Sequence, residues 1–177
     1  MRRIAPVLLI LAALVPAAAV LAANVTRTSR PVRLLRTWEE NIKVGTRELP
    51  RRVEVVFDYG EGVARQNYYT LEGELVGSRK ITQNMPRPSS EEMAEAVALV
   101  RADPELGRIA SRRSAVFEGG FALEEGRGER CGPGSRCLLV QLISPDRVGL
   151  IRWVAVDLVE REVAYRAYSP GFERSGR

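Results

Sequence analysis

The stretch CGPGSRCLLVQLISPDRVGLIRWVAVDLVEREVAYRAY, from Cys131 to Tyr168, decides how this chain folds. Two cysteines close a short loop rich in glycine and proline, and three runs of aliphatic, β-branched and aromatic residues follow. Polar turns at 144–146 and 159–161 separate the runs, which is typical of an antiparallel meander. The middle run, 150–158, is so uniformly apolar that we expect both of its faces to be covered.

The two cysteines of the chain, Cys131 and Cys137, have five residues between them. A loop of this length readily brings the two side chains together, so we expect a disulfide bond. The alternatives are a redox motif, which has two intervening residues, and a metal site, which needs further ligands. We favour the disulfide, which is typical of exported domains and contributes about 2 kcal/mol when it closes so short a loop.

The composition restricts the chemistry that the chain can perform. Its 177 residues, 45% hydrophobic and 28% charged, suit one folded domain, and it contains no histidine, the usual general base and the commonest metal ligand. No phosphate-binding loop or dinucleotide motif occurs, so we expect no catalytic residue, metal or cofactor. The net charge of +5 is mostly arginine, but no nucleic-acid-binding motif accompanies it, and we expect no nucleic-acid partner.

One acidic residue stands out because it lies inside an apolar run. Asp157 is a candidate for a small enzyme that uses carboxylates, which is the catalytic alternative to a binding protein. We favour a structural role, in which Asp157 ends its strand and bonds the following turn.

Residues 1–23 have the layout of a secretory signal peptide. A short basic start precedes an apolar run that ends in small residues, and 17–19 and 20–22 are candidate cleavage sites. An uncleaved membrane anchor is the alternative, because about 20 apolar residues can cross a bilayer. We therefore expect an extracytoplasmic protein, secreted or periplasmic, either free or tethered. The arginines that follow the run would instead suit a cytoplasmic orientation.

Residues 24–52 are expected to form a basic connector with eight basic residues. Four of its arginines could contact anionic lipid, at about 1 kcal/mol each near a charged surface; they are Arg27, Arg30, Arg33 and Arg36. The alternative, which we favour, is a solvated linker with one apolar face of helical spacing that docks on the domain. That face consists of Leu34, Leu35, Trp38 and Ile42.

We expect residues 53–170 to form a single α+β domain, followed by a flexible tail at 171–177. Alternating apolar residues predict strands at 53–59, 63–71 and 74–78, and Gly119-Gly120 predicts a bulge or bend in a later strand. Ser89 and Glu92 form a predicted capping box that opens a helix over 90–102. The expected fold is one main helix packed on a curved antiparallel sheet of about six or seven strands.

The helix SEEMAEAVALVRADP (Ser90–Pro104) and the strand WVAVDL (Trp153–Leu158) before Val163 resemble the small amino-terminal domains of copper amine oxidases. They resemble PepSY-like modules more distantly. The resemblance covers less than half of the chain, and the cysteine pair is not part of it. It implies a cystatin-like α+β fold and a noncatalytic role, because a separate oxidase domain supplies the copper-binding histidines and modified tyrosine. No catalytic residue carries over to this chain.

We therefore expect a noncatalytic secreted or periplasmic binding or accessory protein. Its sheet face or its Cys131–Cys137 hairpin tip would present to a protein or peptide partner in the envelope or outside the cell. The alternative is a membrane-tethered envelope protein whose arginine-rich connector binds anionic lipid.

Overall fold

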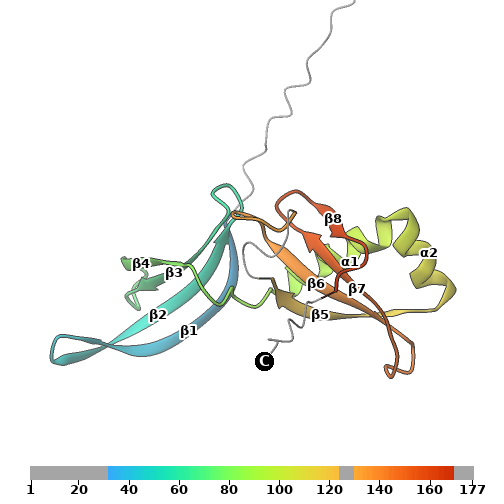
Figure 1. Cartoon of the computed structure of the whole chain (residues 1–177). Coiled ribbons are helices and arrows are strands. Elements are labelled where there is room, and N and C mark those ends of the chain that lie inside the picture. Colours follow the sequence, from blue (N-terminus) through green and yellow to red (C-terminus); the bar gives the residue numbers. More distant parts are fainter. Residues whose placement is uncertain (1–31, 124–129, 170–177) are drawn as a thin grey trace, which may run out of the picture.

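The computed structural model describes residues 32–123 and 130–169. Over these residues the chain forms eight strands and two helices, and the strands make two separate four-stranded antiparallel sheets. The sheets lie side by side and are joined by the segment 82–89 (Figure 1). The prediction of one main helix on a single sheet of six or seven strands is therefore wrong, and so is the cystatin-like fold that accompanied it.

The first sheet is a meander in which each strand pairs with the next one along the chain. Its strands are β1 (Val32–Val44), β2 (Arg47–Asp58), β3 (Val63–Tyr69) and β4 (Leu75–Ile81). Because side chains alternate between faces, the even residues from 36 to 44 share a face with Val53, Val55 and Phe57. This face is mainly apolar, whereas the opposite face is mainly polar.

The expected helical face of the basic connector is in fact part of β1. Trp38 lies opposite Val53, and Ile42 lies opposite Leu49. A bulge shifts the register at Leu35, whose side chain packs against the core. The helical expectation fails because residues spaced four apart share a face of a strand as well as a face of a helix.

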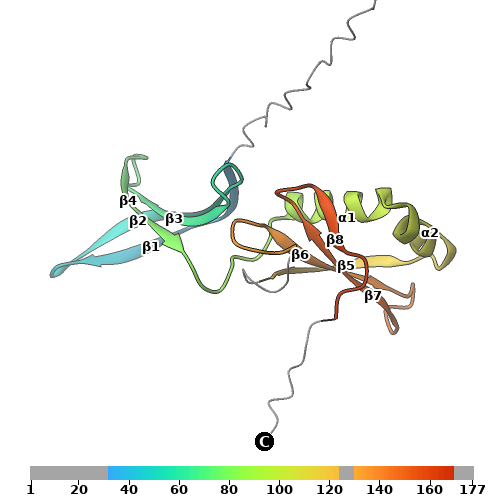
Figure 2. The ribbon, with the colours of Figure 1, turned by 45° about the horizontal axis from the view of Figure 1, so that its top comes forward.

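The second sheet has the order β5-β6-β7-β8 and carries both helices on one face (Figure 2). Its elements are α1 (Ser90–Ala102), α2 (Pro104–Arg112), β5 (Val116–Ala122), β6 (Cys137–Ile143), β7 (Leu150–Asp157) and β8 (Glu162–Tyr165). The predicted capping box is confirmed, since the Ser89 side chain accepts from Glu92 N and the Glu92 carboxylate accepts from Ser89 N. Asp103 caps α2.

Both sheets contribute to one hydrophobic core. Helix residues such as Ala96 and Val100 pack on the inner face of β6 and β7, and Phe57 and Ala64 join them from the first sheet. Val154, Ala155 and Val156 of β7 are fully buried, so both faces of the strand are covered in its second half, whereas Leu150 at its start is exposed. The two sheets therefore share a core although they share no strand pairing.

Several predictions concern residues outside the described part of the chain. These are the signal segment 1–23, the tail 171–177, and Arg27 and Arg30 of the connector. Within residues 32–123 and 130–169, neither helix has the length and apolar character needed to cross a bilayer.

Candidate functional site

A buried ion pair lies at the junction of the two sheets. Arg136, in the loop between the cysteines, is 1% exposed, and Glu92 of α1 is fully buried. The guanidinium donates through Nε to Glu92 Oε1 at 3.0 Å and through Nη2 to Oε2 at 2.9 Å. It also donates to the carbonyl of Pro86 and lies 5.2 Å from the ring centroid of Phe57. One side chain thus contacts α1, the inter-sheet segment and β2.

Tyr59 completes this cluster from the turn after β2. Its hydroxyl donates to Glu92 Oε1 at 2.6 Å. Burial, reinforced by this hydrogen bond, raises the pKa of Tyr59, which therefore stays protonated. Burial also acts to raise the pKa of Glu92, but the hydrogen bonds and charge of Arg136 and the hydrogen bonds from Tyr59 and Ser89 outweigh it and lower that pKa. The carboxylate is ionised and fully paired, so the cluster serves to hold the two sheets together.

The disulfide between Cys131 and Cys137 fixes the loop that carries Arg136. The S–S distance is 2.05 Å and the Cα–Cα distance is 5.8 Å, which confirms the predicted pairing. The loop packs against the first sheet so closely that a Cβ on Gly62 would lie 2.4 Å from the carbonyl oxygen of Gly134. The loop is therefore in contact with the β2–β3 turn.

Asp157 has the structural contacts predicted for it. Its Oδ1 accepts from Val159 N at 2.8 Å, in the following turn, and from Arg136 N at 3.3 Å. Burial raises the pKa of Asp157, and hydrogen bonds from backbone N–H groups offset part of the rise. The carboxylate thus ends its strand and anchors the disulfide loop.

The apolar face of the first sheet carries two hollows. The larger, of about 700 Å³, lies between β1, β2 and the inter-sheet segment. Its charged lining residues are Arg36 and Arg87, and the guanidinium of Arg36 lies 5.1 Å from the ring centroid of Trp38. The other lining residues are mostly apolar: Leu35, Trp38, Val55, Ile81, Asn84, Met85, Pro86 and Pro88.

The smaller hollow, of about 380 Å³, lies further along the same face. It is lined by Glu40, Ile42, Val44, Arg51, Tyr68, Val76 and Gly77. Trp38 of the larger hollow donates its indole N–H to Glu40 Oε2 at 2.9 Å, so the two hollows adjoin. We call them together the trough.

The floor of the trough is set by strand register. Trp38 lies opposite Val53, and Val53 lies opposite Tyr68, so these three side chains form a row across β1, β2 and β3. Val53, in the middle, is fully buried by its neighbours. The trough is therefore built on regular strands, which hold side chains more rigidly than loops do.

Two arginines of the predicted lipid contact, Arg33 and Arg36, lie in the described part of the chain. Arg33 donates to Glu95 of α1 at 3.2 Å and lies 5.5 Å from the ring centroid of Tyr59, so it belongs to the junction. Arg36 lies at the trough.

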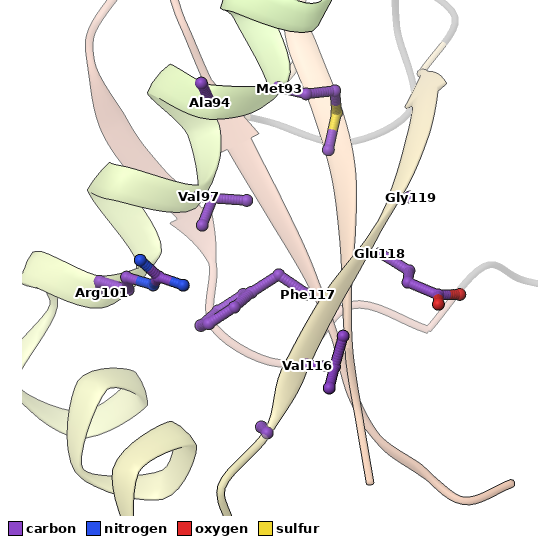
Figure 3. A pocket seen from close by; sticks show the side chains of 9 residues that line it. Met93, Ala94, Val97, Arg101, Val116, Phe117, Glu118 and Gly119 are labelled. Carbon is purple, nitrogen blue, oxygen red and sulfur yellow. The ribbon is translucent and has the colours of Figure 1, made fainter. Parts of the chain in front are cut away.

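A further groove, of about 590 Å³, lies between α1 and the edge strand β5 (Figure 3). Met93 and Val97 point from the helix toward Phe117, while Glu118 points away from it. The guanidinium of Arg101 lies 4.9 Å from the centroid of the Phe117 ring. We assign the ligand site to the trough, because its two adjoining hollows lie on one face of a regular sheet.

The sequence matches no protein family and no curated protein. The resemblance to amine oxidase amino-terminal domains and PepSY-like modules thus stays a prediction. The disulfide fits a location outside the cytoplasm, because the cytoplasm keeps cysteine thiols reduced.

The trough was not predicted from the sequence, and neither was the Arg136–Glu92 pair. Glu92 was assigned to the capping box alone, although Arg136 is the one charged residue between the cysteines. For the trough, the available signal was the alternation of Trp38, Ile42 and Val44 with polar residues, which also fits a strand.

Proposed function

We propose that the protein is a noncatalytic binding protein that works outside the cytoplasm and holds an apolar ligand in the trough. The observation that carries the proposal is the pair of adjoining hollows, about 700 and 380 Å³, on one face of a regular sheet. Ligand sites have volumes of about 300–1,000 Å³ and combine an apolar lining with a few polar groups. The trough has both properties.

The buried junction supports this proposal because it holds one wall of the trough. Pro86 lines the larger hollow, and its carbonyl accepts a hydrogen bond from Arg136 at 3.0 Å. Arg136 is in turn held by Glu92 and by the disulfide loop. A preformed wall lowers the entropic cost of binding a ligand.

Titration with N-phenyl-1-naphthylamine, an uncharged apolar fluorophore, tests the proposal. We expect saturable binding that weakens at least about fivefold in Ile42→Ser, because this change removes apolar surface from the trough. Asn41→Ser, on the opposite face of β1, is the matched control and should bind like the original protein. Absence of saturable binding, or equal binding by Ile42→Ser, would contradict the proposal.

The compartment has a separate test. We expect the protein taken from its host to react with a thiol-alkylating reagent only after reduction, because Cys131 and Cys137 are paired. Intact mass from separated cell fractions would also show whether the segment 1–23 is cleaved. Free thiols in the native protein would contradict the extracytoplasmic location.

A further inference from the structure

Charge is unevenly distributed along the trough. The two charged residues of the larger hollow, Arg36 and Arg87, are both cationic, and within residues 32–123 and 130–169 neither forms an ion pair. In the smaller hollow, Glu40 and Arg51 lie directly opposite each other on β1 and β2. Their opposite charges compensate, so among the residues that line the two hollows the excess of positive charge lies at the larger one. That end of the trough favours an anionic group.

Apolar surface extends away from this positive end. Trp38, Ile42 and Val44 follow Arg36 on the same face of β1, with Glu40 between Trp38 and Ile42, and Tyr68 of β3 lies alongside. The strand from Arg36 to Val44 is roughly 26 Å long at about 3.3 Å per residue. One acyl chain extends about 15 Å in a bilayer leaflet. The trough is therefore long enough for such a chain beside an anionic head group.

We infer that the ligand is a single anionic amphiphile, with its carboxylate or phosphate at Arg36 and Arg87 and its acyl chain along the trough. The inference rests on the proposed function, because it specifies the ligand of the same site. A guanidinium matches the geometry of both anions and can bind either one through two N–H groups. Burial of the chain against Trp38, Ile42 and Tyr68 supplies apolar contact.

Dodecanoate and dodecanol form a matched pair of probes with the same chain length and different head groups. Each is titrated as a monomer against the Trp153→Phe protein, in which Trp38 is the remaining tryptophan of the chain. We expect both to change the Trp38 emission, with dodecanoate binding about tenfold more tightly at low salt. The difference should shrink in 1 M salt, which screens charge.

Charge variants locate the head group. We expect the double variant Arg36→Gln/Arg87→Gln to lose the preference for the anion, so that it binds dodecanoate only as tightly as it binds dodecanol. The control is Lys43→Gln/Lys80→Gln, which removes two cations from the opposite face of the same sheet and should leave both affinities unchanged.

The outcomes distinguish this inference from the proposed function. Equal affinities for dodecanoate and dodecanol would overturn the inference and leave the binding protein in place, whereas no binding of either probe would overturn both. Binding to anionic phospholipid vesicles without binding of monomers would overturn it in favour of a membrane surface. An acidic peptide that displaces dodecanoate with equal affinity would overturn it in favour of a peptide ligand.

Discussion

At the junction of the two sheets, one residue takes part in both a helix cap and a buried ion pair. Glu92 completes the capping box of α1 and also accepts two hydrogen bonds from Arg136. The spacing of Ser89 and Glu92 is visible in the sequence because capping is local. The ion pair with Arg136 joins residues 44 positions apart, and no local sequence pattern predicts it.

Glu92→Gln should destabilise the protein by roughly 3 kcal/mol at pH 7, because it leaves the buried guanidinium of Arg136 without its charge partner. The folded-state pKa of Glu92 lies below its unfolded value of about 4.3. Its contribution to stability is therefore present above that value and is lost as the pH falls through the folded pKa. Urea unfolding at pH 7 and pH 3 measures both effects.

The control for this change is Glu91→Gln, at the exposed neighbouring position in the same helical turn. We expect it to change the unfolding midpoint much less than Glu92→Gln does at pH 7. Equal midpoints for the Glu92 variant and the original protein at neutral pH would show that the ion pair does not stabilise the fold.

Asp157→Asn should change the stability at pH 7 in the opposite direction to Glu92→Gln. Burial raises the folded-state pKa of Asp157, so ionisation disfavours the folded state as the pH rises through the unfolded and then the folded pKa. The asparagine oxygen can still accept from Val159 N. We expect the variant to gain stability relative to the original protein at pH 7 and not at pH 3, measured by thermal unfolding. A loss at pH 7 would contradict this assignment.

At the scale of elements, β5 shows how a strand departs from its simple pattern. The predicted irregularity at Gly119-Gly120 is confirmed, because the pairing register with β6 shifts between Gly119 and Phe121. Gly119 has φ of 138°, and a Cβ there would lie 2.4 Å from the carbonyl oxygen of Leu139. A glycine is required at this point for both conformation and space.

Gly119→Ala should therefore destabilise the protein by at least about 2 kcal/mol, through strained backbone and displacement of β6. Gly132→Ala is the matched control, because a Cβ there meets no atom within 4 Å. Chemical denaturation of both variants measures the difference. A Gly119 variant as stable as the Gly132 variant would show that the bulge adjusts freely.

At the scale of the whole molecule, a small buried cluster determines how the sheets sit together. Arg136 contacts α1, the inter-sheet segment and Phe57 of β2, and the disulfide holds its loop in place. The trough depends on this arrangement because the inter-sheet segment forms one wall of the larger hollow.

Arg136→Gln should loosen the inter-sheet segment, because the variant loses the ionic contact to Glu92 and the hydrogen bond to Pro86. We expect faster protease cleavage within 82–88, measured by limited proteolysis and mass spectrometry. Arg152→Gln, which removes a partly exposed pair with Glu105, is the control and should be cleaved at the original rate. Equal cleavage of both variants would show that Arg136 does not hold the segment.

The sequence by itself determined the local structure of this protein. Alternation, capping, turn residues and cysteine spacing located α1, most strands, the bulge at Gly119-Gly120 and the disulfide, because each depends on neighbours close along the chain. It wrongly predicted a helical face in β1, since residues four apart such as Trp38 and Ile42 share a face of a strand as well as a face of a helix.

Only the tertiary structure decided how the strands divide into two sheets. Backbone hydrogen bonds are alike in every strand, so sequence patterns do not specify which strands pair. The sequence did not predict the trough for the same reason. The trough depends on the register of β1 on β2 and of β2 on β3, which brings Trp38, Val53 and Tyr68 into one row. The wall that closes it depends on Arg136 and Glu92, which meet only when the whole chain has folded.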